Sequence, residues 1–130
     1  MSILHAEFPT VWQLIWKLIN DYKGWDCSVF CRRTGLGDDI YYKARNNDKS
    51  LPTIQTIIII CVYMELDKST AEELFTAAGI HLNKAIPTHR ACMFVIYDLA
   101  EESIMIRIEF LNRLGFGKPN SRRKTSVKTL

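Results

Sequence analysis

The chain has 130 residues, of which 48% are hydrophobic and 24% are charged. This length fits one compact domain with a tail, and the composition is that of a globular protein rather than a disordered one. The longest apolar run, residues 57–64, is less than half of what a bilayer span requires. No positive cluster precedes an apolar stretch near the N-terminus, so we expect no secretory signal, no membrane partner and a cytoplasmic location.

The net charge of +3 is unevenly distributed along the chain. Residues 116–130 carry five basic residues and no acidic one, and residues 10–49 carry seven basic and five acidic residues. Residues 50–115, by contrast, carry five basic and eight acidic residues. A polyanion should therefore prefer the N-terminal third and the tail.

The four cysteines lie inside apolar, helix-like stretches, and none forms a C-x-x-C pair. This usage predicts reduced thiols in a cytosolic protein. Cys27 and Cys31 are four residues apart on one expected helix, a spacing that would suit two ligands of a metal ion. Because no second pair of ligands accompanies them, we expect these two cysteines to pack as small hydrophobic residues. We expect neither a metal nor a cofactor.

The N-terminal third predicts three helices separated by short breaks. Apolar residues recur at helical spacing over 10–22, and Lys23-Gly24 ends this first helix. Asp26 can cap a short second helix that runs to about residue 33. The Thr-Gly-Leu-Gly sequence at 34–37 interrupts it, and a third short helix follows over about 38–46. Two short helices joined by a four-residue turn with glycine are typical of a helix-turn-helix.

The centre of the chain is ambiguous between strand and helix. Residues 56–64 form a β-branched run with strand propensity, but the chain offers no partner strand, so we predict a buried central helix. The next helix has the clearest signals, because Ser69 and Glu72 have capping-box spacing and Gly79 is a stop. Two further helices are predicted over about 88–100 and 103–114.

The order of these helices, breaks and caps resembles the Xre family of phage-repressor-like DNA-binding domains. The resemblance is carried by the aromatic-rich first helix ending in Lys23-Gly24, by Thr34-Gly35-Leu36, by the Ile40/Tyr41/Ala44 face, by Leu51-Pro52-Thr53, and by Glu72-Glu73-Leu74 through Ala78-Gly79. The resemblance is greatest to a subgroup of small bacterial proteins that carry extra C-terminal helices. It implies that the protein is encoded by a bacterium or a phage. The fold implied is all-α: a repressor-like five-helix helix-turn-helix bundle over 10–79, extended by about two C-terminal helices over 80–115 and followed by a basic tail over 116–130.

In that family the third helix lies in the major groove while the second crosses the phosphate backbone. If Ile40, Tyr41 and Ala44 face the core, the remaining residues of the third helix face outward. The candidate base contacts are then Asp38, Asp39, Tyr42, Lys43, Arg45 and Asn46, and the candidate phosphate contacts are Arg32, Arg33, Asn47 and Lys49.

Asp38 and Asp39 depart from what a DNA-reading helix needs. Two acids suit a helix N-terminus because of its dipole, but they repel phosphates, and only cytosine N4 offers them a natural donor among the bases. Either this surface reads sites that contain cytosine, with phosphate contacts elsewhere, or it has been turned to another purpose.

Two functions therefore stay open. The first is a sequence-specific transcriptional regulator that binds double-stranded DNA as a homodimer. The alternative is a protein-binding adaptor or inhibitor on a helix-turn-helix scaffold that no longer reads DNA. Residues 80–115 carry too many apolar positions for one stripe, so part of them can form a dimer face or bind a protein partner, unless they simply pack on the first and fifth helices.

An enzyme is not expected. His5, His81 and His89 lie in unrelated contexts, and the sequence has no metalloprotease motif, no Ser/His/Asp pattern and no phosphate-binding loop.

Overall fold

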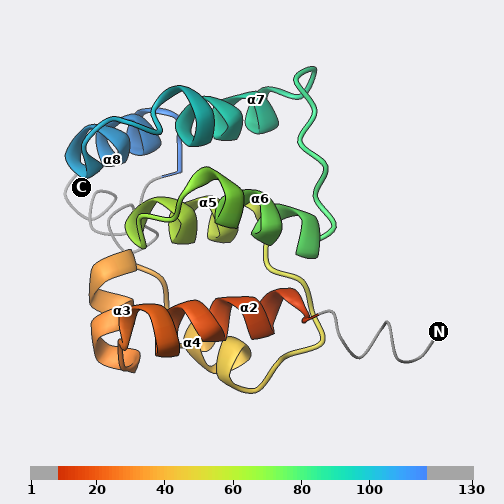
Figure 1. The fold of residues 1–130 in the computed structure, drawn as a ribbon, viewed down its shortest axis with the longest axis vertical. Coiled ribbons are helices and arrows are strands. Elements are labelled where there is room, and N and C mark those ends of the chain that lie inside the picture. Colours follow the sequence, from red (N-terminus) through yellow and green to blue (C-terminus); the bar gives the residue numbers. More distant parts are fainter. Residues whose placement is uncertain (1–8, 117–130) are drawn as a thin grey trace, which may run out of the picture.

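The computed structural model describes residues 9–116, and every regular element in this range is a helix (Figure 1). The absence of strands from these residues confirms the predicted all-α class. The elements, in which η denotes a π-helical segment, are α2 (Val11–Lys17), η1 (Leu18–Lys23), α3 (Cys27–Thr34), α4 (Asp38–Arg45), α5 (Ile54–Tyr63), α6 (Lys68–Ala77), α7 (Pro87–Met93), η2 (Phe94–Asp98) and α8 (Ile104–Arg113).

The helices stack in three layers (Figure 1). The lower layer holds α2, α3 and α4, the middle layer holds α5 and α6, and the upper layer holds α7 and α8. α5 is the centre of the molecule, because it packs against α3, α6, η2 and α8. Its residues from Thr56 to Val62 are all buried, so the β-branched run forms a helix that is covered on every side, as predicted.

Most helix ends follow the signals in the sequence, but one does not. Thr10, Asp26 and Thr53 each cap a helix with their side chains. The prediction that Ser69 caps α6 is wrong, because the helix begins at Lys68 and the Asp67 carboxylate accepts the N–H of Thr70 at 2.8 Å. An aspartate in this place is favoured because its negative charge also opposes the positive end of the helix dipole.

Two helices that the sequence predicts as regular pass into π geometry. α2 continues without a break as η1, and α7 continues as η2. η1 ends at Gly24, whose left-handed φ of 66° lets the N–H of Trp25 reach the carbonyl of Ile19. A π turn holds more residues than an α turn, so side chains beyond Lys17 no longer follow the α-helical spacing.

The upper layer covers the middle layer. α8 packs on α5, and η2 packs on both α5 and α6. The alternative that residues 80–115 pack on the first and fifth predicted helices thus holds for the fifth, which is α6, while the other main support is α5 rather than the first helix. Several large apolar side chains of this layer remain exposed nevertheless: Tyr97, Met105, Ile106 and Leu114.

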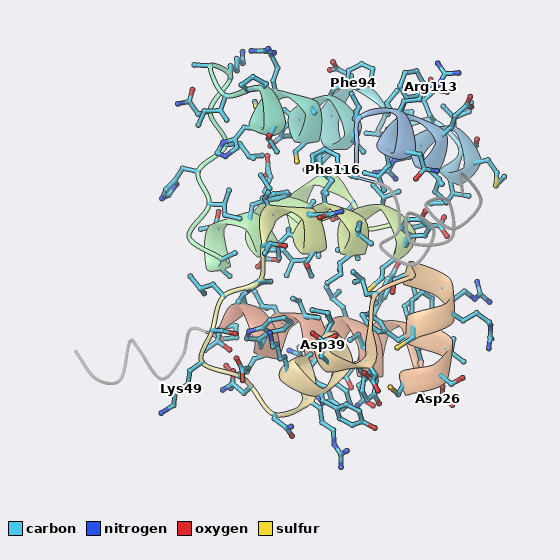
Figure 2. The ribbon with its side chains drawn as sticks, turned by 180° about the vertical axis from the view of Figure 1, so that it is seen from behind. Asp26, Asp39, Lys49, Phe94, Arg113 and Phe116 are labelled. Atoms are coloured by element: carbon cyan, nitrogen blue, oxygen red, sulfur yellow. The ribbon has the colours of Figure 1, made fainter. Side chains whose placement is uncertain are left out.

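The last described residue packs into the core. Phe116 is buried, its N–H donates to the carbonyl of Leu111, and Figure 2 shows it between the upper and middle layers. Phe116, the first residue of the expected basic tail, thus belongs to the core, and the rest of that tail lies outside the described residues. Over 9–116, no helix is both long enough and apolar enough to span a bilayer.

Candidate functional site

The unit α3–turn–α4 joins two eight-residue helices through a turn at 35–37. Gly35 ends α3 with a left-handed φ of 78°, and its N–H donates to the carbonyl of Cys31 at 2.8 Å. Thr34 is fully buried, and its hydroxyl donates to the carbonyl of Phe30 at 2.8 Å and accepts the N–H of Leu36 at 3.1 Å. The direction in which α4 leaves α3 is thus fixed from inside the protein.

α4 is anchored by one face. Ala44 is buried and Ile40 and Tyr41 are half-buried, as the predicted inward face requires. The Tyr41 ring makes an edge-to-face contact with Trp16 of α2, with centroids 5.4 Å apart, and lies 6.1 Å from Phe30 of α3. α4 therefore rests on α2 and α3, away from the upper layer (Figures 1 and 2).

The outer face of α4 carries all six predicted base-contact residues. Five of them are exposed and Lys43 is half-buried: the exposed ones are Asp38, Asp39, Tyr42, Arg45 and Asn46. Their charges are segregated, with both acids in the first turn and Lys43 and Arg45 in the last turn. The Asp39 carboxylate lies over the helix start, because a Cβ placed on Gly37 would be only 2.7 Å from its Oδ1 atom.

The four predicted phosphate-contact residues are not in one cluster. Arg32 and Arg33 are exposed in the last turn of α3, whereas Lys49 lies at the other end of the lower layer from Asp26, the residue that caps α3 (Figure 2). Asn47 has a φ of 50°, and its side-chain carbonyl accepts the Thr10 hydroxyl at 2.5 Å. This amide therefore fixes the loop to the start of α2 and has only its amino group left for a phosphate.

One group of cations was missed by the sequence reasoning. Two cations lie close to the ring of Trp25. The ammonium of Lys23, on η1, is 5.7 Å from the ring centre, and the guanidinium of Arg33, on α3, is 5.8 Å from it. Lys23 also lies 4.8 Å from the centre of the Tyr22 ring. Neither cation is paired with an acid, since the ion pair found among residues 9–116 joins Arg113 to Glu109. In the sequence Lys23 was interpreted only as part of a helix end. Its contact with an aromatic ring could not be predicted, because that contact depends on how the chain turns at Gly24.

Three of the cysteines, Cys31 within α3 and Cys61 and Cys92 elsewhere, have thiols with raised pKa values. Burial, together with the neighbouring Cys27, raises the pKa of Cys31 to about 11, so its thiol stays protonated at neutral pH. Burial likewise raises the pKa of Cys61 strongly and that of Cys92 to about 12. None of the four forms a disulfide, and residues 9–116 contain no group of three or more side chains suited to hold a metal ion.

The outer face of α4 offers donors and acceptors for base edges. Lys43 and Arg45 can donate to guanine O6 and N7, and Asn46 can pair with adenine N6 and N7. The two carboxylates can only accept hydrogen bonds while they are ionised. No protein-family model, curated protein or solved structure matches this chain.

Proposed function

We propose that this protein is a helix-turn-helix regulator of transcription that binds double-stranded DNA, with α4 in the major groove. The observation that supports this most is a short helix held from behind by α2 and α3, with a polar outer face that no other described element covers. A helix of this diameter fits the major groove, which is about 12 Å wide.

The segregated charges assign different roles to the two halves of α4. Lys43, Arg45 and Asn46 form the half that contacts base edges, and Arg32, Arg33, Lys49 and Lys23 supply phosphate contacts on either side. Asp38 and Asp39 oppose binding at most sequences, because a carboxylate finds a donor only at cytosine. They therefore act against non-specific binding and contribute to specificity.

The layered fold limits how two copies can read one duplex. Repressor-type dimers contact half-sites about 34 Å apart on the same side of the DNA. Two copies joined across the outer surface of the upper layer would carry their α4 helices at opposite ends of the dimer (Figure 1). A homodimer that reads paired half-sites must instead form along the sides of the layers, close to the lower one.

The experiment is duplex binding measured by fluorescence anisotropy, first with a random-sequence pool and then with selected sites. We expect affinity to fall steeply between about 50 and about 200 mM salt, because phosphate neutralisation releases counterions. Arg45→Ala should lower affinity for the selected site by about tenfold and change the sequence preference. Arg113→Ala, in the ion pair of the upper layer, is the matched control and should change nothing. Absence of any duplex binding at the lower salt concentration would refute the proposal.

The second candidate is a protein-binding module on the same scaffold. It is favoured by two exposed acids in the first turn of α4, Asp38 and Asp39, and by the exposed Tyr42 in the middle of the helix. The double variant Asp38→Asn/Asp39→Asn separates the two functions. It should strengthen binding to DNA if α4 enters the groove, because two like charges are removed from the phosphates. It should instead weaken capture of a protein partner if the carboxylates are the contact surface.

A further inference from the structure

A groove of about 440 Å³ lies between the first helix and α6, apart from the outer face of α4. Its apolar lining comes from Leu14, Leu18 and the buried Leu74. Its volume lies within the range of small-molecule sites, which typically combine apolar walls with a few polar groups. The charged side chains that line the same groove are Lys17, Asp21 and Glu73.

These three charged groups are exposed and form no ion pair with one another or with any other residue from 9 to 116. One ammonium and two carboxylates thus lie around an apolar floor. The Oδ1 atom of Asp21 accepts the side-chain amide of Asn20 at 3.1 Å, and this neutral donor leaves the charge of the carboxylate uncompensated. A hydrocarbon ligand would use none of the three charges, and a dianion would be repelled by Asp21 and Glu73. The complementary ligand has an ammonium, a carboxylate and an apolar body.

We propose that this groove binds a free apolar amino acid. Its ammonium, which has three donors, lies between the carboxylates of Asp21 and Glu73, and its carboxylate pairs with Lys17. Its side chain covers the three leucines and removes their apolar surface from water. The exposed ring of Tyr22, which lines the same groove, gives an aromatic side chain a partner.

The groove is connected to α4 through the first helix. Leu18 and Asp21 belong to η1, the π-helical continuation of α2, and π segments inside helices are frequent at functional sites. Another side of α2 carries Trp16, which packs on Tyr41 of α4. A ligand in the groove would therefore contact the same continuous helix that supports α4, which gives a route for coupling between the two sites. This coupling rests on the proposed function, whereas the binding of the amino acid does not.

The test is isothermal titration calorimetry of the full chain with L-phenylalanine and L-leucine. Matched probes each remove one feature of the ligand: N-acetyl-L-phenylalanine has no ammonium, L-phenylalaninamide has no carboxylate, and glycine has no apolar body. We expect saturable binding of the two apolar amino acids and affinities about tenfold weaker for each of the three probes. Absence of saturable binding by both amino acids, or tighter binding of the amide than of the acid, would overturn the proposal.

Variants locate the site. Asp21→Asn/Glu73→Gln should weaken L-phenylalanine binding by about tenfold or more, and Lys17→Met should bind the acid and its amide equally. Glu101→Gln/Glu102→Gln, at two exposed positions before α8, is the charge-matched control for the double variant, and circular dichroism checks that each variant folds. Unchanged binding in the double variant would contradict the site. Amino-acid binding without duplex binding would leave this inference standing and remove the proposed function, and the reverse result would remove only the inference.

Discussion

α5 and α4 are both short helices, but they differ in how much of their surface the protein uses. Every residue of α5 from Thr56 to Val62 is buried, whereas Ala44 is the one buried residue of α4. α5 therefore determines whether the chain folds, and the exposed part of α4 is available for binding without cost to the core. The comparison teaches that stability and the proposed DNA contacts depend on different helices, so single substitutions can distinguish them.

The largest effect is expected in α5. Ile59→Ala should lower the free energy of unfolding by about 2–5 kcal/mol, because it removes a fully buried side chain and leaves a cavity. Arg45→Ala on the exposed side of α4 should change it by less than about 0.5 kcal/mol. Urea denaturation followed by circular dichroism measures both. Equal losses in the two variants would contradict the division between core helix and binding helix.

A smaller effect is expected where the core meets the site. Thr34→Val keeps the shape of the side chain but leaves the N–H of Leu36 without its buried acceptor, which should cost about 1–3 kcal/mol. The same change frees the turn before α4, so duplex affinity should fall even where the protein is still folded. A variant with reduced stability and unchanged duplex affinity would show that this hydroxyl does not orient α4.

Loss of the N-terminal cap of α3 should lower the free energy of unfolding by a smaller amount. Asp26→Ala removes the acceptor of the Val29 N–H and should cost about 1 kcal/mol, with fraying confined to the start of α3. Hydrogen exchange of the α3 amides, compared with those of α5, checks this expectation. Asp26→Asn keeps an acceptor in place and should lose only part of the stability.

The smallest effect is a dependence on pH at the start of α6. The backbone N–H and the hydroxyl of Thr70 donate to Asp67 and lower the pKa of its carboxyl below the ordinary 3.8. The resulting stabilisation is fully present above pH 3.8 and is lost as the pH falls through the pKa of the folded state. The difference in unfolding free energy between wild type and Asp67→Asn, measured at about pH 7 and about pH 2.5, should therefore shrink in acid. A difference that grows in acid would contradict this assignment.

The sequence predicted most of the helices because their signals are local. Helix starts were predicted from three capping residues: Thr10, Asp26 and Thr53. The run from Ile57 to Ile60 folds as a helix because burial on all sides outweighs its strand propensity. The start of α6 was predicted at the wrong residue, because Asp67 and Ser69 are both good caps and their spacing alone does not rank them.

The parts that could not be predicted depend on contacts between distant residues. The outward face of α4 followed from the helical period, but the cluster of Lys23 and Arg33 around Trp25 depends on the turn at Gly24. The groove along η1 was also missed, since neither the π geometry nor the pairing of the first helix with α6 has a signal in the sequence. Phe116 looked like part of the tail because a glycine lies on either side of it and basic residues follow, while its contacts lie in the core.

The contacts that hold α4 in place have a consequence for engineering. The position and orientation of the helix depend on residues outside its outer face, namely Ile40, Tyr41, Ala44 and the buried Thr34. The outward side chains can therefore be randomised as a library while the scaffold stays constant. Variants that bind a chosen target can then be selected from such a library without redesigning the core beneath α4.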